Sequence, residues 1–218
     1  MPLSHNPYLI VSDFENRLAE WCGSKYCVCV ESGTAAIFLS LQYRKKQKGE
    51  LGKVTIPKHT YNSVACSIIH SGGKIGFWNG LNWEGYYGIY PLDIFDAALR
   101  FKKNMYDNVM IKNNGLMCLS FHIKKHLPIG RGGAILLDDA EAYEWLKLAR
   151  FDGREQIPIR EQKEFKVLGW NMYMSVEQAA RGIELFEVLR RKHPDGLPDL
   201  STEDQGYPDL SKFPIYQQ

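Results

Sequence analysis

The segment from Leu116 to Gly133 constrains the fold more than any other part of the chain. It begins with a short apolar run that predicts a buried strand, and it ends in a Gly-x-Gly-Gly turn before a second apolar run, residues 134–137. The polar side chains between the two runs include Ser120, His122, Lys124 and Lys125. A lysine held away from water loses part of its preference for the charged form and becomes a nucleophile toward aldehydes. The segment therefore favours imine chemistry, and the alternative is a basic turn that only faces solvent.

Length and composition bound the class of protein. A chain of 218 residues can form one substantial α/β domain but is short for two. The net charge of +2 gives no indication of a nucleic-acid or membrane partner. The first residues lack the pattern of a signal peptide, and no apolar run has the length of a membrane span. The five cysteines form no C-x-x-C pair, which fits small buried side chains in a reducing compartment. We therefore expect a cytoplasmic protein.

Helices and strands follow one another along the chain. A helix over 12–22 is expected to be capped by Ser12 or Asp13 and ended by Gly23. Further helices are predicted to about residue 44 and over 62–70, 138–150 and 175–192, the last with Ser175 and Gln178 as a capping box. Strands are predicted over 26–30, 54–57, 72–78 and 92–98, and a loop over 79–90.

The turn after the first strand is a candidate anion site. Strand 26–30 leads into Glu31-Ser-Gly-Thr-Ala-Ala36, and a helix follows. A strand, a turn of small residues and a helix together aim free backbone N–H groups at an anion. An ordinary strand–helix connection has the same pattern, so both interpretations stay open at this point.

Five motifs occur in a fixed order. They are Phe14-Glu15 with Ser32-Gly-Thr-Ala-Ala36, Pro57-x-x-Thr60-Tyr61, Asp96-x-Ala98, Ser120-Phe-His-x-x-Lys125 with its glycine turn, and Gly169-x-Asn171 with Gln178-Ala-Ala180. In this order they resemble the DegT-type nucleotide-sugar aminotransferases, which are pyridoxal 5'-phosphate (PLP) enzymes of fold type I. The resemblance implies a three-layer αβα large domain with a mostly parallel sheet, reduced in size.

The resemblance also implies roles for the residues around the cofactor ring. Lys125, five residues after Ser120, would carry PLP as a Schiff base, rather than Lys124. Asp96 would pair with the pyridine nitrogen and keep it protonated, which makes the ring a strong electron sink. Tyr61 would stack on the ring. Without the resemblance, Asp96 would be interpreted as a strand-end cap and Tyr61 as a core residue at a helix start.

The cofactor phosphate and the quaternary structure are implied in the same way. The resemblance gives the phosphate to Gly33, Thr34, Ala35 and Ser120. It also gives a homodimer with shared active sites, in which Asn171 reaches the phosphate of the neighbouring subunit. The alternative for Asn171 is a helix-entry residue whose side chain bonds its own backbone.

Some features depart from the family pattern. The segment between Phe77 and Leu92 is shorter than in typical members, and the C-terminal small domain of typical members is absent. Three residues differ from the usual ones: Arg131 replaces Glu, Leu99 replaces Gln or His, and Tyr173 replaces Arg. We expect a PLP-binding domain over 1–192 and an extended Pro/Asp/Gly-rich arm over 193–218. The arm contains two copies of one short sequence, Gly196-Leu-Pro-Asp-Leu-Ser and Gly206-Tyr-Pro-Asp-Leu-Ser.

The predicted function is transamination of a keto-sugar nucleotide, with glutamate or glutamine as the amino donor. The dehydratase branch of the family has His in place of the lysine, so Lys125 favours transamination. The rival hypothesis is a non-catalytic, PLP-binding or PLP-free remnant that serves as a partner subunit or regulator. His122 and His126 have the spacing of a metal pair, but they lie in a turn with no evident third ligand, so no metal site is predicted.

Overall fold

The computed structural model describes residues 6–78, 82–108 and 115–217. The α-helices are α1 (Leu9–Cys22), α2 (Gly33–Lys48), α3 (Asn62–His70), α4 (Met105–Asn108), α5 (Ala140–Ala149), α6 (Val176–Lys192) and α7 (Thr202–Gln205). The strands are β1 (Tyr26–Val30), β2 (Lys53–Pro57), β3 (Lys74–Trp78), β4 (Tyr87–Ile89), β5 (Ile94–Asp96), β6 (Leu116–Ser120) and β7 (Gly133–Leu137). Three short 3₁₀ turns complete the described elements: η1 (Ile159–Glu161), η2 (Leu210–Lys212) and η3 (Pro214–Tyr216).

The expectation of a mostly parallel sheet is wrong. The main sheet has the strand order β1-β7-β6-β5-β4, and within it only β5 and β6 pair in parallel. The reason is the length of the connections. Residues 90–93 join β4 to β5, and residues 121–132 join β6 to β7 without a crossover helix, so each pair runs antiparallel. β2 and β3 form a separate parallel pair, which a bridge between Thr55 and Tyr90 links to the main sheet.

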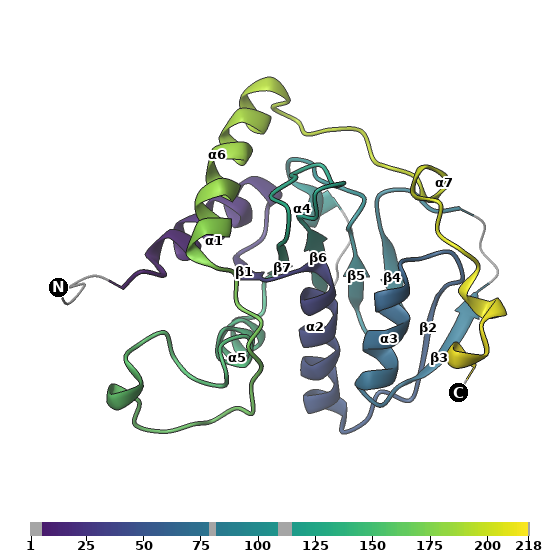
Figure 1. Ribbon diagram of the computed structural model, residues 1–218, viewed down its shortest axis with the longest axis horizontal. Helices are drawn as coiled ribbons and strands as arrows, with labels where there is room; N and C mark the ends of the chain where they lie inside the picture. Colours follow the sequence, from purple (N-terminus) through teal and green to yellow (C-terminus); the bar gives the residue numbers. More distant parts are fainter. Residues whose placement is uncertain (1–5, 79–81, 109–114, 218) are drawn as a thin grey trace.

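Helices cover both faces of the main sheet (Figure 1). Alternate strand residues face opposite sides, so Val28 and Ile135 belong to one core while Cys29 and Ala134 belong to the other. The first core also contains residues of α2, α3 and α5, and the second contains residues of α1, α4 and α6. The layering of an α/β protein is therefore observed, around a mixed sheet.

Local signals placed most elements within a few residues. The predicted strand 26–30 and helix 62–70 coincide with β1 and α3, and Gly23 ends α1 in the left-handed conformation at φ 81°. The predicted capping box at the start of α6 is confirmed. The cap of α1 is different from the expected one: the helix begins one turn earlier, after Tyr8, without a side-chain cap. The predicted loop over 79–90 contains β4, because Tyr87 and Ile89 fill the core.

A buried ion pair that the sequence did not predict joins three elements. The Arg150 guanidinium, after the end of α5, donates to the Glu15 carboxylate of α1 and to the backbone oxygen of Cys29 in β1. Glu15 Oε1 also accepts from the backbone N–H of Cys29 at 2.7 Å. Removing one partner of such a pair typically costs about 3–5 kcal/mol, because the other charge is left uncompensated. Glu15 follows Phe14 in the first motif, so this motif contributes to the core.

After α6 the chain turns back across the molecule, and its C-terminal residues lie beside β2 and β3 (Figure 1). The segment 194–217 packs on the same chain through the buried side chains of Thr202 and Leu210. The division into a domain over 1–192 and an arm stays a prediction. No helix in the described part of the chain is long and apolar enough to cross a membrane.

Candidate active site

A cavity of about 500 Å³ lies where the sheet meets the starts of α2 and α3. Asp96 and Ser120 are the last residues of two parallel neighbours, β5 and β6, so their side chains reach the same edge of the sheet. Six of the eight predicted site residues line this cavity: Gly33, Thr34, Tyr61, Asp96, Ser120 and Lys125. The fold thus brings together residues that lie up to 92 positions apart in the sequence.

One end of the cavity is suited to an anion. Gly33 begins α2 and contacts the end of β6 so closely that a Cβ atom on it would lie 2.8 Å from the Ser120 Cβ. Thr34 Oγ1 lies 2.8 Å from Ser63 Oγ at the start of α3, so two helix N-termini and three hydroxyl groups face the same space. Helix N-termini carry partial positive charge and free N–H groups, which favours a phosphate. The phosphate site at this turn stays a prediction.

Ala35 is adjacent to the anion end but outside the cavity lining. Its backbone N–H donates to the Ser32 side chain at 3.0 Å, and this bond caps α2. Its predicted contact with the cofactor phosphate stays a prediction.

Asp96 also lines the cavity; it is 4% exposed, and each of its carboxylate oxygens accepts a hydrogen bond. Its Oδ2 accepts from the Tyr87 hydroxyl at 3.0 Å, and its Oδ1 accepts from the Ala98 N–H at 3.0 Å. Burial raises the pKa of this carboxyl, while the Ala98 N–H, the Tyr87 hydroxyl and the Lys125 amine act in the opposite direction. The side chain therefore closes a local turn, as the alternative interpretation expected, and it also lines the cavity.

Lys125 and Lys124 have different environments. Both lysines line the cavity, but the Lys124 side chain is exposed, which fits a solvated turn, whereas Lys125 is half-buried. Burial lowers the pKa of Lys125, the Asp96 charge raises it, and the neighbouring Lys124 lowers it. The Lys125 Nζ donates to Gln205 Oε1 at 3.1 Å and to the Tyr207 hydroxyl at 3.2 Å. Of the two lysines, Lys125 therefore has the partial burial and lowered pKa that favour a nucleophilic amine.

Tyr61 lies at the mouth of the cavity. Its ring is 56% exposed, so the alternative of a core tyrosine is wrong. The ring centroid is 6.1 Å from that of Tyr207, and both residues line the cavity. An aromatic face in this position can cover a flat ligand. The stacking role itself stays a prediction.

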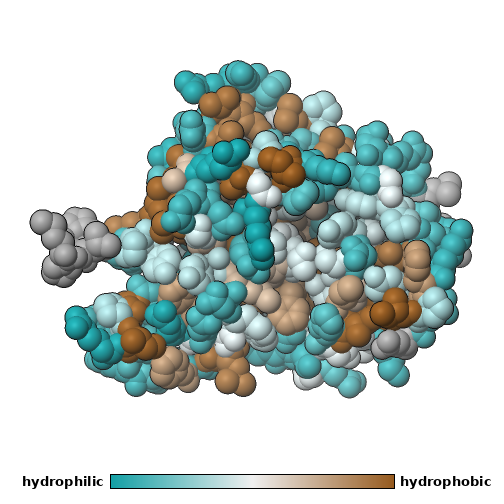
Figure 2. Space-filling view, in the orientation of Figure 1, coloured by the Kyte–Doolittle hydropathy of each residue, from teal (hydrophilic) through white to brown (hydrophobic). Residues whose placement is uncertain are grey.

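Asn171 lies outside the cavity of its own chain. It is exposed, in the loop between α5 and α6, and its amide donates to Asp152 at 3.2 Å. The same loop exposes three large apolar side chains: Ile159, Phe165 and Leu168. Figure 2 shows apolar atoms on this loop at the lower left of the view.

The three substituted positions have separate environments. The Arg131 guanidinium lies at the cavity, with its Nη2 2.7 Å from Glu31 Oε2. Leu99 is fully buried in the core beneath the sheet edge. Tyr173 packs against Phe151, with ring centroids 4.7 Å apart. Of the three, Arg131 is therefore the one placed to influence a ligand.

Sequence reasoning missed several lining residues. Ser63 and Asn62 follow Tyr61 at the start of α3, where polar residues are usual, and that position was their signal. Gln205 and Tyr207 come from the C-terminal arm, and no sequence pattern indicated that this arm reaches the cavity. Among the residues that the structure describes, no group of three His, Cys, Asp or Glu side chains could hold a metal ion. His126 instead bonds the backbone oxygen of Pro198 at 2.8 Å.

Comparison with known proteins identifies the family. The sequence profile described as the DegT/DnrJ/EryC1/StrS aminotransferase family matches residues 5–79 and 94–193. A curated relative, the spore coat polysaccharide biosynthesis protein SpsC of Bacillus subtilis (strain 168), is 26% identical over 223 residues. That match covers 82% of this chain but 57% of the relative, so the chain spans little more than half of that protein.

Two solved structures have the same fold. A DegT DnrJ EryC1 StrS aminotransferase from Brucella abortus superposes with a TM-score of 0.67 at 22% identity, covering 84% of this chain and 59% of that one. PseC of Helicobacter pylori, an aminotransferase involved in the biosynthesis of pseudoaminic acid, superposes with a TM-score of 0.68 at 16% identity. That match covers 99% of this chain and 80% of PseC. With most of its length matched by the family profile, the chain belongs to the DegT/DnrJ/EryC1/StrS aminotransferase family.

Proposed function

We propose that this chain is a PLP-dependent aminotransferase that converts a keto-sugar nucleotide to an amino sugar, with glutamate or glutamine as the donor. The observation that carries the proposal is the convergence of Asp96, Lys125 and the N-terminus of α2 on one cavity. The family uses PLP, and a cavity of about 500 Å³ is in the size range of sites for small organic ligands.

The residues fit the cofactor at three points. Lys125 would carry it through a Schiff base, Asp96 would pair with the ring nitrogen, and Tyr61 would cover one face of the ring. The hydroxyls of Thr34 and Ser120 and the N–H groups around Gly33 would hold the phosphate. When bound there, PLP supplies an electron sink for the substrate carbon.

Lys125 would then act as both base and acid. Its buried amine has a lowered pKa, so a larger neutral fraction is present at neutral pH than for an ordinary lysine. Once the donor amine has released it, Lys125 Nζ can accept a proton from the substrate carbon and return it on the other side of the transfer. Asp96, held by Tyr87 and the Ala98 N–H, stays in place throughout.

The sugar-nucleotide substrate is supported by the family and by the names of relatives. SpsC is named for spore coat polysaccharide biosynthesis, and PseC for the biosynthesis of pseudoaminic acid. Both names concern sugars, which agrees with the substrate class that the motifs imply.

A donor half-reaction tests the activity. Protein loaded with PLP is expected to lose its visible Schiff-base absorption when glutamate or glutamine is added, and to recover it when a keto-sugar nucleotide is added. Absorbance measured against a panel of amino donors and keto-sugar nucleotides checks this. The rival hypothesis of a non-catalytic remnant predicts a spectrum that no donor in the panel changes.

A second prediction concerns a homodimer with shared sites. Asn171 is exposed beside an apolar loop and lies outside its own cavity, which supports a role at a neighbour's phosphate. Chains carrying Lys125→Ala and chains carrying Asn171→Ala are each expected to be inactive. When the two are mixed under conditions of subunit exchange, one site per mixed dimer has both residues intact, so activity should partly return.

The mixing experiment includes its own control. Subunit exchange is verified with differently tagged chains by native mass spectrometry, and each parent is assayed alone. A monomer in solution, or no recovery despite verified exchange, would contradict the shared site. Asn171 would then be the helix-entry residue of the alternative interpretation, with its bond to Asp152 as its role.

A further inference from the structure

The C-terminal arm contains two copies of Gly-x-Pro-Asp-Leu-Ser: the first ends before the residues of the arm that line the cavity, 205–208, and the second begins within them. The first copy covers residues 196–201, and the second covers residues 206–211. In both copies the Asp side chain forms an ion pair with a residue outside the arm, and the backbone N–H of the following Leu donates to a backbone oxygen outside the arm. The repeat therefore attaches the arm to the rest of the chain at two equivalent points. The proposed function assigns no role to these two attachments.

The first attachment is close to β5. Asp199 lies between two cations, with its Oδ1 3.2 Å from Lys102 Nζ and its Oδ2 bonded to the Arg100 guanidinium. The pKa of Asp199 is lowered: burial acts to raise it, but the hydrogen bonds from Arg100 and Lys102 outweigh this effect. The Leu200 N–H donates to the backbone oxygen of Leu99 at 2.9 Å. These contacts fix the arm before it reaches the cavity.

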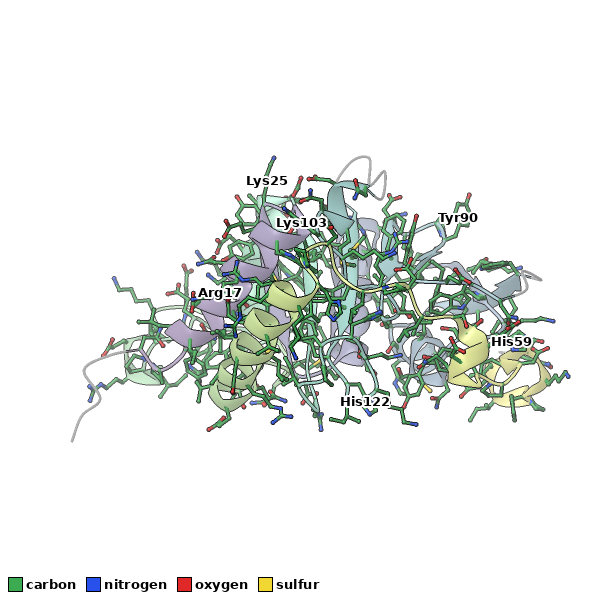
Figure 3. All side chains as sticks on the ribbon, turned by 90° about the horizontal axis from the view of Figure 1, so that it is seen from above. Arg17, Lys25, His59, Tyr90, Lys103 and His122 are labelled. Atoms are coloured by element: carbon green, nitrogen blue, oxygen red, sulfur yellow. The ribbon has the colours of Figure 1, made fainter. Side chains whose placement is uncertain are left out.

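The second attachment is beyond β2. Asp209 Oδ2 lies 3.5 Å from Lys58 Nζ, and the Leu210 N–H donates to the Lys58 backbone oxygen at 2.8 Å. The His59 ring nitrogen Nδ1 lies 3.1 Å from the backbone oxygen of Tyr207. Figure 3 shows His59 beside the C-terminal segment. The arm is therefore held at both ends of the stretch that crosses the cavity.

Between the attachments, two side chains meet the Lys125 amine. Gln205 Oε1 and the Tyr207 hydroxyl accept from Lys125 Nζ at 3.1 and 3.2 Å, from positions two residues apart. Burial, together with the nearby Asp96 and Tyr61, raises the pKa of Tyr207, so its hydroxyl stays neutral. Gln205 carries no charge at any pH. Both groups can therefore orient the amine without neutralising it as a carboxylate would.

We propose that Gln205 and Tyr207 are positioning residues for Lys125, and that the duplicated sequence exists to hold them against its amine. The value of this positioning for catalysis rests on the proposed function. An amine held in one place would return to the same atom of the cofactor after each turnover. The Gln205 oxygen and the Tyr207 hydroxyl set the direction of the amine, and residues 205–208 contribute to the lining of the cavity.

Competitive acetylation of the PLP-free chain tests the contacts directly. The extent of acetylation at Lys125, measured by peptide mass spectrometry across a pH series, gives the midpoint of its titration, with Lys124 as the internal reference. Gln205→Glu places a carboxylate beside the ammonium and should raise the midpoint by roughly one unit. Tyr207→Phe and Gln205→Leu each remove an acceptor that favours the ammonium, so each should lower it by roughly half a unit.

Tyr143→Phe is the matched control, because Tyr143 stacks on Tyr26 away from the cavity. Its midpoint should equal that of the wild type. Unchanged midpoints in Gln205→Glu and Tyr207→Phe, or equal shifts in the control, would overturn the proposal. Circular dichroism checks the folding of each variant, and if Tyr207→Phe does not fold, the opposite shifts of Gln205→Glu and Gln205→Leu decide the outcome.

A second measurement separates this proposal from the proposed function. With PLP added, the fraction of chains reduced by borohydride onto Lys125 should fall several-fold in Tyr207→Phe at limiting cofactor. If the wild type itself forms no adduct, the proposed function fails, while the acetylation midpoints still decide whether Gln205 and Tyr207 position the amine. An adduct that forms equally in the wild type and in Tyr207→Phe, with unshifted midpoints in all three arm variants, would reject the positioning role alone.

Discussion

Replacing Lys125 with alanine is expected to abolish the visible Schiff-base absorption of the PLP-loaded protein and its hydride-trapped adduct. The reason is the difference in burial: both lysines line the cavity, but Lys124 is exposed, whereas Lys125 is half-buried and its Nζ bonds Gln205 and Tyr207. Transamination should fall by on the order of 10²–10⁴-fold beyond any loss of binding, because the same amine moves the proton. Absorption spectra, borohydride reduction and peptide mapping measure the three effects.

Lys124→Ala is the matched control for this change. It removes an exposed positive charge from the cavity lining and leaves the bonds of Lys125 Nζ to Gln205 and Tyr207 in place, so the absorption should remain. The neighbouring charge lowers the pKa of Lys125, and its removal should therefore shift the Lys125 titration to higher pH. Loss of the adduct in Lys124→Ala with its retention in Lys125→Ala would show that the two lysines have been assigned the wrong way round.

Asp96→Asn is expected to leave PLP bound, though more weakly, and to reduce transamination by at least roughly a hundredfold. An amide has nearly the same shape, so the bonds around Tyr87 and Ala98 need little rearrangement. It carries no charge and does not keep the ring nitrogen protonated, so a large electrostatic contribution is lost. Cofactor affinity by fluorescence titration and turnover by coupled assay separate binding from chemistry.

The pH profile gives an independent signature of Asp96. Burial raises the pKa of this carboxyl, so its charge is lost as the pH falls through a value above that of an ordinary aspartate. The acid side of the wild-type rate profile should therefore begin at a higher pH than exposed carboxylates would give, and Asp96→Asn should lack this limb. Near-normal turnover in the variant would show that Asp96 has no part in the mechanism. Its role would then be the local turn in which it accepts from the Ala98 N–H.

The sequence by itself determined the local elements and the chemistry at their ends. β1, α3 and the capping box of α6 depend on alternation, helical spacing and capping, all of which act within a few residues. Six of the eight predicted site residues line one cavity, because they lie at strand ends and helix starts, which come together at the edge of a sheet.

The tertiary structure decided what depends on distant partners. Strand direction is set by the lengths of the connections and by the final neighbours of each strand, and local periodicity contains neither. The pair of Glu15 and Arg150 joins residues 135 positions apart, and Gln205 comes within 3.1 Å of Lys125 only because two ion-paired attachments carry the arm across the cavity. Contacts of this kind arise when folding buries two remote groups together, and no short stretch of the chain encodes either one alone.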